Sequence, residues 1–443
     1  MMRVFLCIGP ITMIAACSTS APSSTGSVGS SQSLHSAQQT QQPNDGWSAA
    51  EGPVTGGSRA IKEHIYRVHN RAELAQALMA GSGKLAAPTL KVIFIDGTID
   101  LSVDDNNRPL VESDYRDPAF NWDDYARAFD LQIWGKKPAA GPLEEARKRS
   151  AARQESVVVL HVGSNTSLIG VGNKALIKNG NLMVKNAENV IIRNISFEDS
   201  YDYFPQWDPS DNANGEWNAA YDNVTLYGAR RVWIDRCTFS DGARPDHLNR
   251  MTLGRQMQFH DGLLDIVRGS DLITVSNSHF KNHDKGSLIG NSDSRADDAG
   301  KLRVTLHHNW FDNIKERSPR VRFGRVHAYN NLYSAAPDGK YAYGYSIGVG
   351  YQSQIAAQNN VFEMPAIAEP RVFRLWRGER FHAAGNLVNG VEVNSLAMLR
   401  SQTSAEAGAV LNDQLDWTPT FHLAIDPTSR VAQFVRSNAG AER

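Results

Sequence analysis

A short pattern recurs seven times between residues 190 and 388 and constrains the fold more than any other feature of the chain. Each copy alternates apolar and polar residues as a β-strand does, turns at a polar residue that is usually Asn, and resumes with an apolar or aromatic residue. The copies occupy residues 190–197, 232–239, 273–280, 304–311, 326–333, 355–362 and 381–388. The shortest aromatic interval, 22 residues from Phe311 to Tyr333, fits one coil of a parallel β-helix.

This repeat predicts an all-β, single-domain solenoid. Asn suits a tight left-handed turn, and Asn side chains stacked on successive coils form an amide ladder. The two-residue hairpins that a β-propeller or jelly roll requires are scarce in the sequence. The longest intervals, 42 and 41 residues on either side of Phe239, predict long loops inserted on one face.

The open ends of a solenoid need covers. Residues 70–79 read as a short amphipathic helix with a capping box from Asn70 to Glu73, which predicts a cap at the N-terminal end. Residues 104–155 interrupt the strands with an aromatic and charged insertion, helical near 142–153, and strands resume at 157–160 and 166–170. After Val391 the repeat is lost, and we expect that tail to lie across the coils.

The N-terminus reads as a targeting segment. Arg3 precedes an apolar run too short to span a membrane, and small residues precede Cys17, as in a bacterial lipoprotein cleavage box. We therefore expect a lipoprotein signal peptide at 1–16, a disordered Ser/Gln-rich tether at 17–45 and the folded domain at 46–443. An ordinary secretory signal is the alternative. Either signal takes the protein out of the cytoplasm, and an anchor at Cys17 would make it an outer-membrane or cell-surface lipoprotein.

Composition narrows the function. The chain has 443 residues with 46 Lys and Arg against 47 Asp and Glu, so no net charge points to nucleic acid. Its 41% hydrophobic and 21% charged residues argue against wholesale disorder, a coiled coil and a multi-span membrane protein. Cys237 is left without a mature partner and is expected to be a small buried hydrophobe. We expect a monomer.

Carboxylates gather where the loops are longest. Asp222 and Asp261 precede the aromatic residues of consecutive coils by 17 and 19 residues, and Asp265 follows at i+4. Adjacent coils lie about 4.8 Å apart, so the three side chains can converge on one hard cation, for which calcium is the best candidate. The alternative is a set of turn-forming aspartates, which β-helices commonly contain.

The next coils carry cations at a corresponding place. Lys285, Arg317 and Arg322 follow their aromatic residues closely, and stacking would put them beside the carboxylates on one outer face. Such a group of cations suits the binding of a polyanion. The alternative is that they are solvated cations in turns, which would give the same sequence pattern. Arg320 is expected to be structural because of its position in the strand. His283, His307 and His308 are also expected to belong to turns or to the core.

At these residues the chain strongly resembles the pectate lyases of polysaccharide lyase family 1. The resemblance runs from about 157 to 362 and is carried by separate motifs. They are WNAAYD at 217–222, VWID at 232–235, HDGLLD at 260–265, HDK at 283–285, LIG at 288–290, RSPRVRFG at 317–324 and VHAYNN at 326–331.

The resemblance implies a right-handed parallel β-helix with Ca²⁺ held by Asp222, Asp261 and Asp265. It also implies that Arg317 is the base and that Lys285 and Arg322 bind the substrate carboxylate. The sequence departs from the family at Arg236, where His is usual. It departs again at Ala220, where some members have a further acidic ligand, so the calcium site is expected to be weaker.

The implied reaction is β-elimination in polygalacturonate (pectate), which leaves a 4,5-unsaturated end. A free guanidinium loses its proton only at very high pH, so Arg317 can act as a base only if nearby positive charge lowers its pKa. Three alternatives remain at this point. They are a β-helix glycoside hydrolase that uses Asp222 and Asp261 as acid and base, a surface-tethered protein that binds pectin without cleaving it, and a pectin lyase, which needs no calcium.

Overall fold

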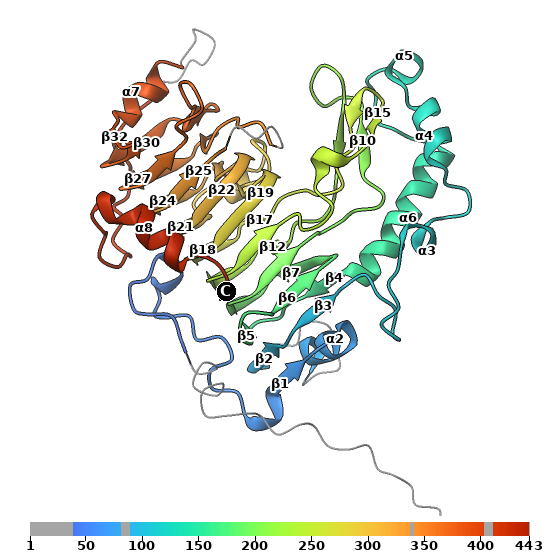
Figure 1. Cartoon of the computed structure of the whole chain (residues 1–443), viewed down its shortest axis with the longest axis horizontal. Coiled ribbons are helices and arrows are strands. Elements are labelled where there is room, and N and C mark those ends of the chain that lie inside the picture. The colour runs from blue at the N-terminus through green and yellow to red at the C-terminus, as the bar shows by residue number, and fades with distance from the viewer. Residues whose placement is uncertain (1–38, 81–88, 337–340, 403–410, 443) are drawn as a thin grey trace, which may run out of the picture.

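The chain winds into a stack of coils. The computed structural model describes residues 39–80, 89–336, 341–402 and 411–442 (Figure 1). Across these residues each complete coil adds one strand to each of three sheets of ten, eight and ten strands, which are parallel apart from the final β31–β32 pair. The expected all-β solenoid, a parallel β-helix, is therefore confirmed.

The strands follow one another in each sheet in chain order. Sheet 1 contains β1 (Ile65–Val68), β2 (Lys91–Ile95), β5 (Thr166–Gly170), β8 (Glu188–Arg193), β13 (Arg230–Asp235), β18 (Asp271–Ser276), β21 (Arg303–His307), β24 (Arg325–Tyr329), β27 (Gln354–Gln358) and β30 (Arg380–Ala384). Sheet 2 contains β4 (Val159–His161), β7 (Asn181–Lys185), β12 (Val224–Tyr227), β17 (Leu264–Val267), β20 (Leu288–Ile289), β23 (Arg320–Val321), β26 (Ile347–Val349) and β29 (Phe373–Leu375). Sheet 3 contains β3 (Thr98–Asp100), β6 (Leu176–Lys178), β9 (Ser196–Glu198), β14 (Thr238–Ser240), β19 (His279–Lys285), β22 (Trp310–Glu316), β25 (Leu332–Ser334), β28 (Val361–Glu363), β31 (Leu387–Val388) and β32 (Val391–Glu392).

Helices and two small hairpins decorate the coils. The helices are α2 (Arg71–Met79), α3 (Glu112–Tyr115), α4 (Trp122–Ala128), α5 (Leu131–Trp134), α6 (Pro142–Val158), α7 (Ser395–Arg400) and α8 (Thr428–Asn438), with 3₁₀ turns η1 (Trp47–Ala49), η2 (Lys62–His64), η3 (Asp246–Leu248) and η4 (Ala296–Asp298). The hairpins pair β10 (Gln206–Asp208) with β11 (Glu216–Asn218) and β15 (Met251–Thr252) with β16 (Arg255–Gln256).

In the turn from sheet 1 to sheet 3, one residue bends the backbone and the next residue bonds to the neighbouring coil. The first residue takes the left-handed conformation, as Asn330 (φ 51°) and Asn359 (φ 51°) do. The next residue forms the amide ladder, in which Asn331 Nδ2 donates to Asn360 Oδ1 at 3.1 Å. The complete ladder runs through Asn309, Asn331, Asn360 and Asn386. Cys237 occupies the ladder position on an earlier coil and is fully buried, as expected.

The aromatic residue two places after each ladder position fills the core. Successive rings stack nearly parallel, with centroids 4.8 Å apart for Phe239 and Phe280 and again for Phe280 and Phe311. Tyr333 and Phe362 extend the stack. The repeat therefore builds one continuous core in which each coil packs mainly against its neighbours.

Additions cover both ends of the stack. The expected N-terminal helix is α2, in which Asn70 accepts from the backbone N–H of Glu73 at 2.9 Å and Leu74 reaches the core. At the far end Leu399 of α7 packs into the same core. The helix predicted at 142–153 is α6, but it continues through Val158, so the strand expected at 157–160 begins only at Val159. Figure 1 shows α4, α5 and α6 rising on one side of the coils.

Both chain ends run back across the sheets. The C-terminal tail crosses the coils as expected, and α8 packs beside β25 and β28. The boundary expected at residue 46 is too late, because Gln41 and Asp45 are already buried. The Asp45 carbonyl accepts from Thr274 Oγ1 of sheet 1 at 3.1 Å, and Gln41 bonds to Ser48 within the same segment; composition alone does not reveal these contacts. Residues 1–38, which include the expected signal peptide and most of the tether, lie outside the described residues.

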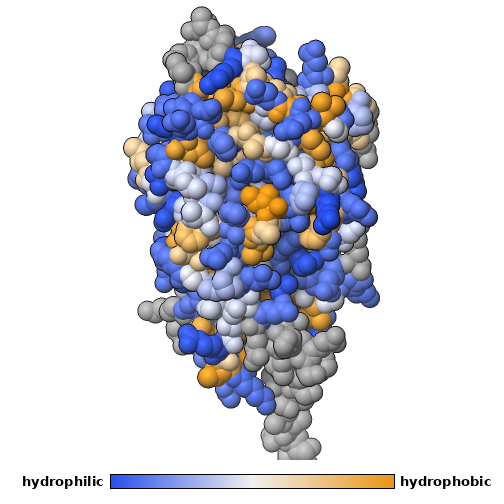
Figure 2. Space-filling view, turned by 90° about the vertical axis from the view of Figure 1, so that its left-hand side faces the viewer, coloured by the Kyte–Doolittle hydropathy of each residue, from blue (hydrophilic) through white to orange (hydrophobic). Residues whose placement is uncertain are grey.

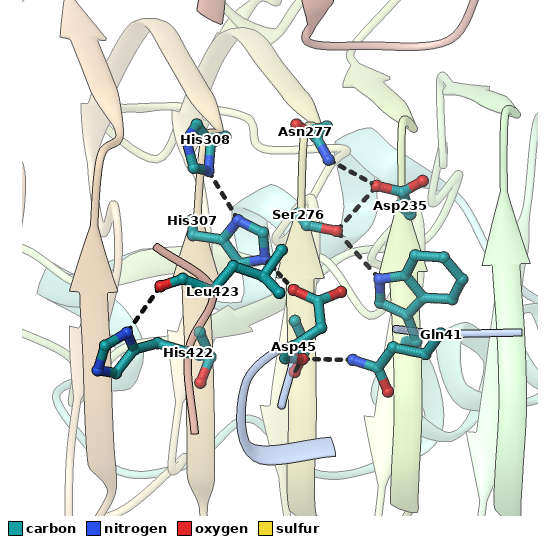
Figure 3. A network of polar contacts seen from close by, with 12 residues as sticks. Gln41, Asp45, Asp235, Ser276, Asn277, His307, His308, His422 and Leu423 are labelled. Atoms are coloured by element: carbon teal, nitrogen blue, oxygen red, sulfur yellow. Dashed lines mark hydrogen bonds and ion pairs between the residues drawn. The ribbon is translucent and has the colours of Figure 1, made fainter. Parts of the chain in front are cut away.

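A polar network connects the N-terminal segment around Asp45 and the C-terminal tail, here called the two straps, to the middle coils (Figure 3). His307 Nε2 lies 2.9 Å from Asp45 Oδ1, and His307 Nδ1 lies 2.8 Å from His308 Nδ1. His308 Nε2 in turn lies 3.2 Å from Asp426 Oδ2 of the C-terminal tail. The expectation that His307 and His308 are structural is thus confirmed.

The outer surface is largely polar. On the side that carries α7 and α8, hydrophobic residues form small separated patches among hydrophilic ones (Figure 2). Within the described ranges, no helix combines the length and apolar character needed to cross a bilayer.

We expect acid to destabilise the fold through two buried histidines. Burial lowers the pKa of His327 to about 3, and burial followed by the charge of His307 lowers that of His308 to about 4. An unfolded histidine has a pKa of about 6.5, so this stability is complete above that pH and is lost as pH falls towards these values, by up to about 1.4 kcal/mol per pH unit for each histidine.

The measurement is the free energy of unfolding at pH 7 and pH 5. His327→Gln removes one titrating group, so the variant should lose less stability between these two pH values than the parent does. Equal losses in both proteins would contradict the assignment.

Candidate functional site

The six residues singled out by sequence line one groove on the outer side of sheet 2. The groove has a volume of about 400 Å³ and is lined by Asp222, Asp261, Asp265, Lys285, Arg317 and Arg322, together with Asn218, Thr225, Tyr227, Val267, Arg268, Leu288 and Asn291. These residues come from consecutive coils around β12, β17, β20 and β23, so the groove runs along the direction in which the coils stack. Stacking therefore brings the predicted acidic and basic residues together.

Asp222 is held just before β12. Its Oδ2 accepts from Thr225 Oγ1 at 2.6 Å, and its Oδ1 accepts from the backbone N–H of Gly262 at 2.8 Å. Gly262 is required here, because a Cβ would lie 2.6 Å from Asp265 Oδ1 and 2.9 Å from Asp222 Oδ1. The two carboxylates thus close around a backbone position that has no room for a side chain.

Asp261 is positioned by two cationic side chains. Lys285 Nζ donates to Asp261 Oδ1 at 3.0 Å, and His283 Nε2 donates to the Asp261 backbone carbonyl at 2.6 Å. The other nitrogen of His283 contacts the carboxylate of Asp241. The Lys285 side chain is only 9% exposed, whereas that of Asp261 is 35% exposed towards the groove. His283 is buried as expected, yet it also shapes the site.

Charge is unevenly balanced among the three carboxylates. Burial, followed by the charges of Asp265 and Asp261, raises the pKa of Asp222 well above its usual range. Burial and the charge of Asp261 likewise raise the pKa of Asp265, whose Oδ1 accepts from the Leu288 N–H at 2.9 Å. Burial would also raise the pKa of Asp261, but Lys285 and then Arg317 hold it below its usual range. Asp261 alone is paired directly with a cation, whereas Arg317 and Lys285 only partly offset the charge of Asp265.

Arg317 faces the groove from a bend between β22 and β23. Its backbone is left-handed (φ 62°), and its carbonyl accepts from the Ser287 N–H at 2.6 Å on the preceding coil. Its Nε lies 3.2 Å from Glu316 Oε1 but without hydrogen-bond geometry, and within the described part of the chain its guanidinium makes no hydrogen bond. The group lies beside Glu316, lines the groove and remains available to a ligand.

The protein groups around Arg317 act against a low pKa. We expected calcium and neighbouring cations together to lower that pKa, and the protein groups alone do not. Burial does act in that direction, but the charges of Glu316, Asp261 and Asp265 outweigh it and raise the pKa. Without added positive charge, the carboxylates of the groove stabilise the protonated guanidinium.

Arg322 completes the basic side of the groove. Its Nε donates to Asp293 Oδ1 at 2.7 Å and its Nη1 donates to the Gly290 carbonyl at 3.0 Å. The interpretation of Arg320 from its position in the strand is wrong. Val321 between them is buried in the core, so strand alternation turns both arginines outwards.

The carboxylates are not a ready-made cage for a metal. Among the residues that the structure describes, no group of three or more His, Cys, Asp or Glu side chains is close enough to hold a metal ion by itself. Nevertheless the donor set fits a hard cation, because buried carboxylate oxygens with raised pKa values converge at Gly262. Ca²⁺ takes about six to eight oxygen ligands, so water or substrate oxygens must complete such a site.

Two contributors were missed by sequence reasoning. Gly262 could have been recognised from its place between Asp261 and Asp265, where small size suggests close approach. Asp293, which orients Arg322, carries no recognisable signal, because it comes from a loop outside the repeat.

Comparison with known proteins gives a consistent result. The family model described as pectate lyase matches residues 139–443. A curated pectate lyase of Bacillus subtilis is 44% identical over 405 residues, which cover 91% of this chain and 93% of the relative. A solved pectate lyase bound to a hexasaccharide aligns with a TM-score of 0.85 at 43% identity, covering 91% of this chain and 98% of that one. Another structure, solved to study substrate specificity and the anti β-elimination mechanism of pectate lyase, aligns with the same values.

Proposed function

The chain belongs to the pectate lyase family and is a polysaccharide lyase, and from that premise we propose that it cleaves α-1,4-polygalacturonate by calcium-dependent β-elimination. The products would be 4,5-unsaturated oligogalacturonates. The observation that carries this proposal is the single groove that combines three carboxylates with Lys285, Arg317 and Arg322. A relative whose structure holds a hexasaccharide and another studied for anti β-elimination support the same reading.

The alternatives fit less well. A glycoside hydrolase or a binding protein without activity would not belong to a family of lyases. A pectin lyase acts on methyl esters and has no need of buried carboxylates, whereas Asp222 and Asp265 are retained at a position where they repel each other.

The reaction needs a base near C5 of a galacturonate ring and positive charge near its carboxylate. Lys285 and Arg322, each oriented by a carboxylate of the protein, can bind the ring carboxylate and stabilise the carbanion that forms when the C5 proton leaves. Arg317, whose guanidinium is free of hydrogen bonds among the described residues, is the group available to take that proton. The C4–O glycosidic bond then breaks, and the leaving oxygen takes up a proton.

Calcium bound by Asp222, Asp261 and Asp265 would supply positive charge that neutralises these carboxylates and polarises the substrate carboxylate. This compensation matters for Arg317, because Asp261 and Asp265 otherwise raise its pKa. The residues that hold the metal and the residue that takes the proton are thus coupled electrostatically.

The first prediction of the proposed function concerns the metal and the product. A chelator should abolish the ultraviolet absorbance of unsaturated product formed from polygalacturonate, and calcium should restore it. Asp261→Asn removes one anionic ligand and should raise the calcium concentration needed for half-maximal activity by about tenfold. Asp105→Asn, whose side chain is 97% exposed, is the matched control and should change nothing. Full activity in excess chelator would rule out the metal.

The second prediction separates the base from the residues that bind substrate. Arg317→Lys keeps a cation but loses the planar group, so kcat should fall by about a hundredfold or more while polygalacturonate still binds. Lys285→Ala and Arg322→Ala should raise KM about tenfold in addition to lowering turnover. The assay is kcat and KM with direct binding at saturating calcium. Near-parental kcat in Arg317→Lys would assign the base to another residue.

The third prediction concerns location, which stays a proposal because Cys17 lies outside the described residues. We propose that the protein is exported and anchored by a lipid at Cys17, the membrane being contacted only through that anchor, and that it acts as a monomer. The unaltered protein should then partition into a detergent phase and Cys17→Ser should not. Soluble export of both proteins would indicate an ordinary signal peptide.

A further inference from the structure

Sheet 2 continues past the groove with an outward row of unusual composition. Leu288 lies in the groove, and its register partners on the following coils are Arg320, Gly348 and Arg374. Neighbouring strands are about 4.8 Å apart, so Arg374 lies roughly 10 Å beyond Arg320 along the direction of the groove. A chain lying in the groove that continued in this direction would reach this row.

Gly348 lets the side chains of this row meet. A Cβ at Gly348 would lie 3.2 Å from Arg320 Cγ and 3.3 Å from Trp376 Cδ1, so the two side chains approach each other over the bare backbone of β26. The Arg320 guanidinium carbon lies 4.6 Å from the centroid of the Trp376 ring, and that of Arg374 lies 3.9 Å from it. The indole therefore holds two guanidinium groups close together.

The protein neutralises these cations only in part, because the charge of Glu316 acts on both without forming a direct ion pair. In the described part of the chain, neither Arg320 nor Arg374 forms an ion pair with a carboxylate. Burial lowers the pKa of both residues, and the nearby charges of Arg322 and Arg371 lower them further. An aromatic ring attracts a guanidinium through its quadrupole without cancelling its charge, so the cluster remains a receptor for an anion.

Unpaired polar atoms point to the same conclusion. Arg320 Nε, Trp376 Nε1 and Tyr345 Oη are all buried, and none has a hydrogen-bond partner among the residues that the structure describes. Buried donors without partners cost stability, and a ligand with acceptor oxygens could satisfy them only if these side chains turned outwards on binding. A uronate ring offers both carboxylate and hydroxyl oxygens.

We propose that Arg320, Arg374 and Trp376 form an outlying subsite that binds a galacturonate ring of the same polygalacturonate chain, beyond the rings at the cleaved bond. This inference rests on the proposed function and names a further part of its substrate site. The subsite would make the enzyme favour long, unesterified chains, because a methyl ester removes the charge that the arginines bind.

The test compares a long and a short substrate at saturating calcium. Arg374→Gln should lower kcat/KM for polygalacturonate by about tenfold, the loss of one charge-assisted contact, and leave kcat/KM for trigalacturonate unchanged. Arg374→Lys should restore part of the loss. Arg59→Gln is the control, since Arg59 is exposed on the strap that lies against sheet 1, and it should alter neither substrate.

Two outcomes would overturn the proposal. Equal losses on both substrates would mean that Arg374 supports the fold or the catalytic groove, and an unchanged value for polygalacturonate would mean that no subsite exists. Calorimetry of the binding of both saccharides to parent and variant distinguishes a failure of the subsite proposal from a failure of the proposed function. If the parent cleaves neither saccharide, the proposed function fails, yet a selective loss of long-chain affinity in Arg374→Gln still supports the subsite and equal affinity overturns it.

Discussion

The register between stacked coils is the constraint on which every other feature of the molecule depends. It is maintained at one turn, where a residue such as Asn330 bends the chain and its neighbour Asn331 binds the next coil through both its backbone and its side chain. Each ladder amide donates to a carbonyl on the preceding coil as well, so buried polar groups are satisfied. Because the register does not slip, a residue's place on the surface follows from its distance to the nearest turn.

In the groove on the outer side of sheet 2, this regularity places side chains of like charge next to one another. Carboxylates on adjacent coils lie one strand spacing apart, and burial raises the cost of keeping Asp222 and Asp265 charged side by side. Lys285 pairs directly with Asp261 and acts on Asp265 only through its charge. The fold thereby holds an excess of negative charge beside Arg317, whereas free carboxylates in solution would move apart. A bound cation would reduce the repulsion between these carboxylates.

The repeat was sufficient to predict the coils, the ladder and the outer face shared by the three aspartates and three cations, because these depend on spacing within strands. Features outside the repeat were predicted less well. Asp293 and Trp376 come from loops between strands, so the pairing of Asp293 with Arg322 and of Trp376 with Arg320 cannot be recognised without the folded backbone. The packing of Asp45 depends on His307, which lies 262 residues away in the sequence, so polar composition alone suggested disorder.

The contacts of Asp45 and Asp426 with the histidine pair have a consequence for cooperativity. In an open solenoid, coils interact only with their neighbours, so the array can fray from either end with little effect on the middle. Here Asp45 contacts His307 on β21 (Figure 3), and Asp426 of the C-terminal tail contacts His308 in the turn that follows. Opening the first or the last coils therefore strains contacts at the centre. We therefore expect these contacts to couple both ends of the stack to its middle coils and to make unfolding more cooperative.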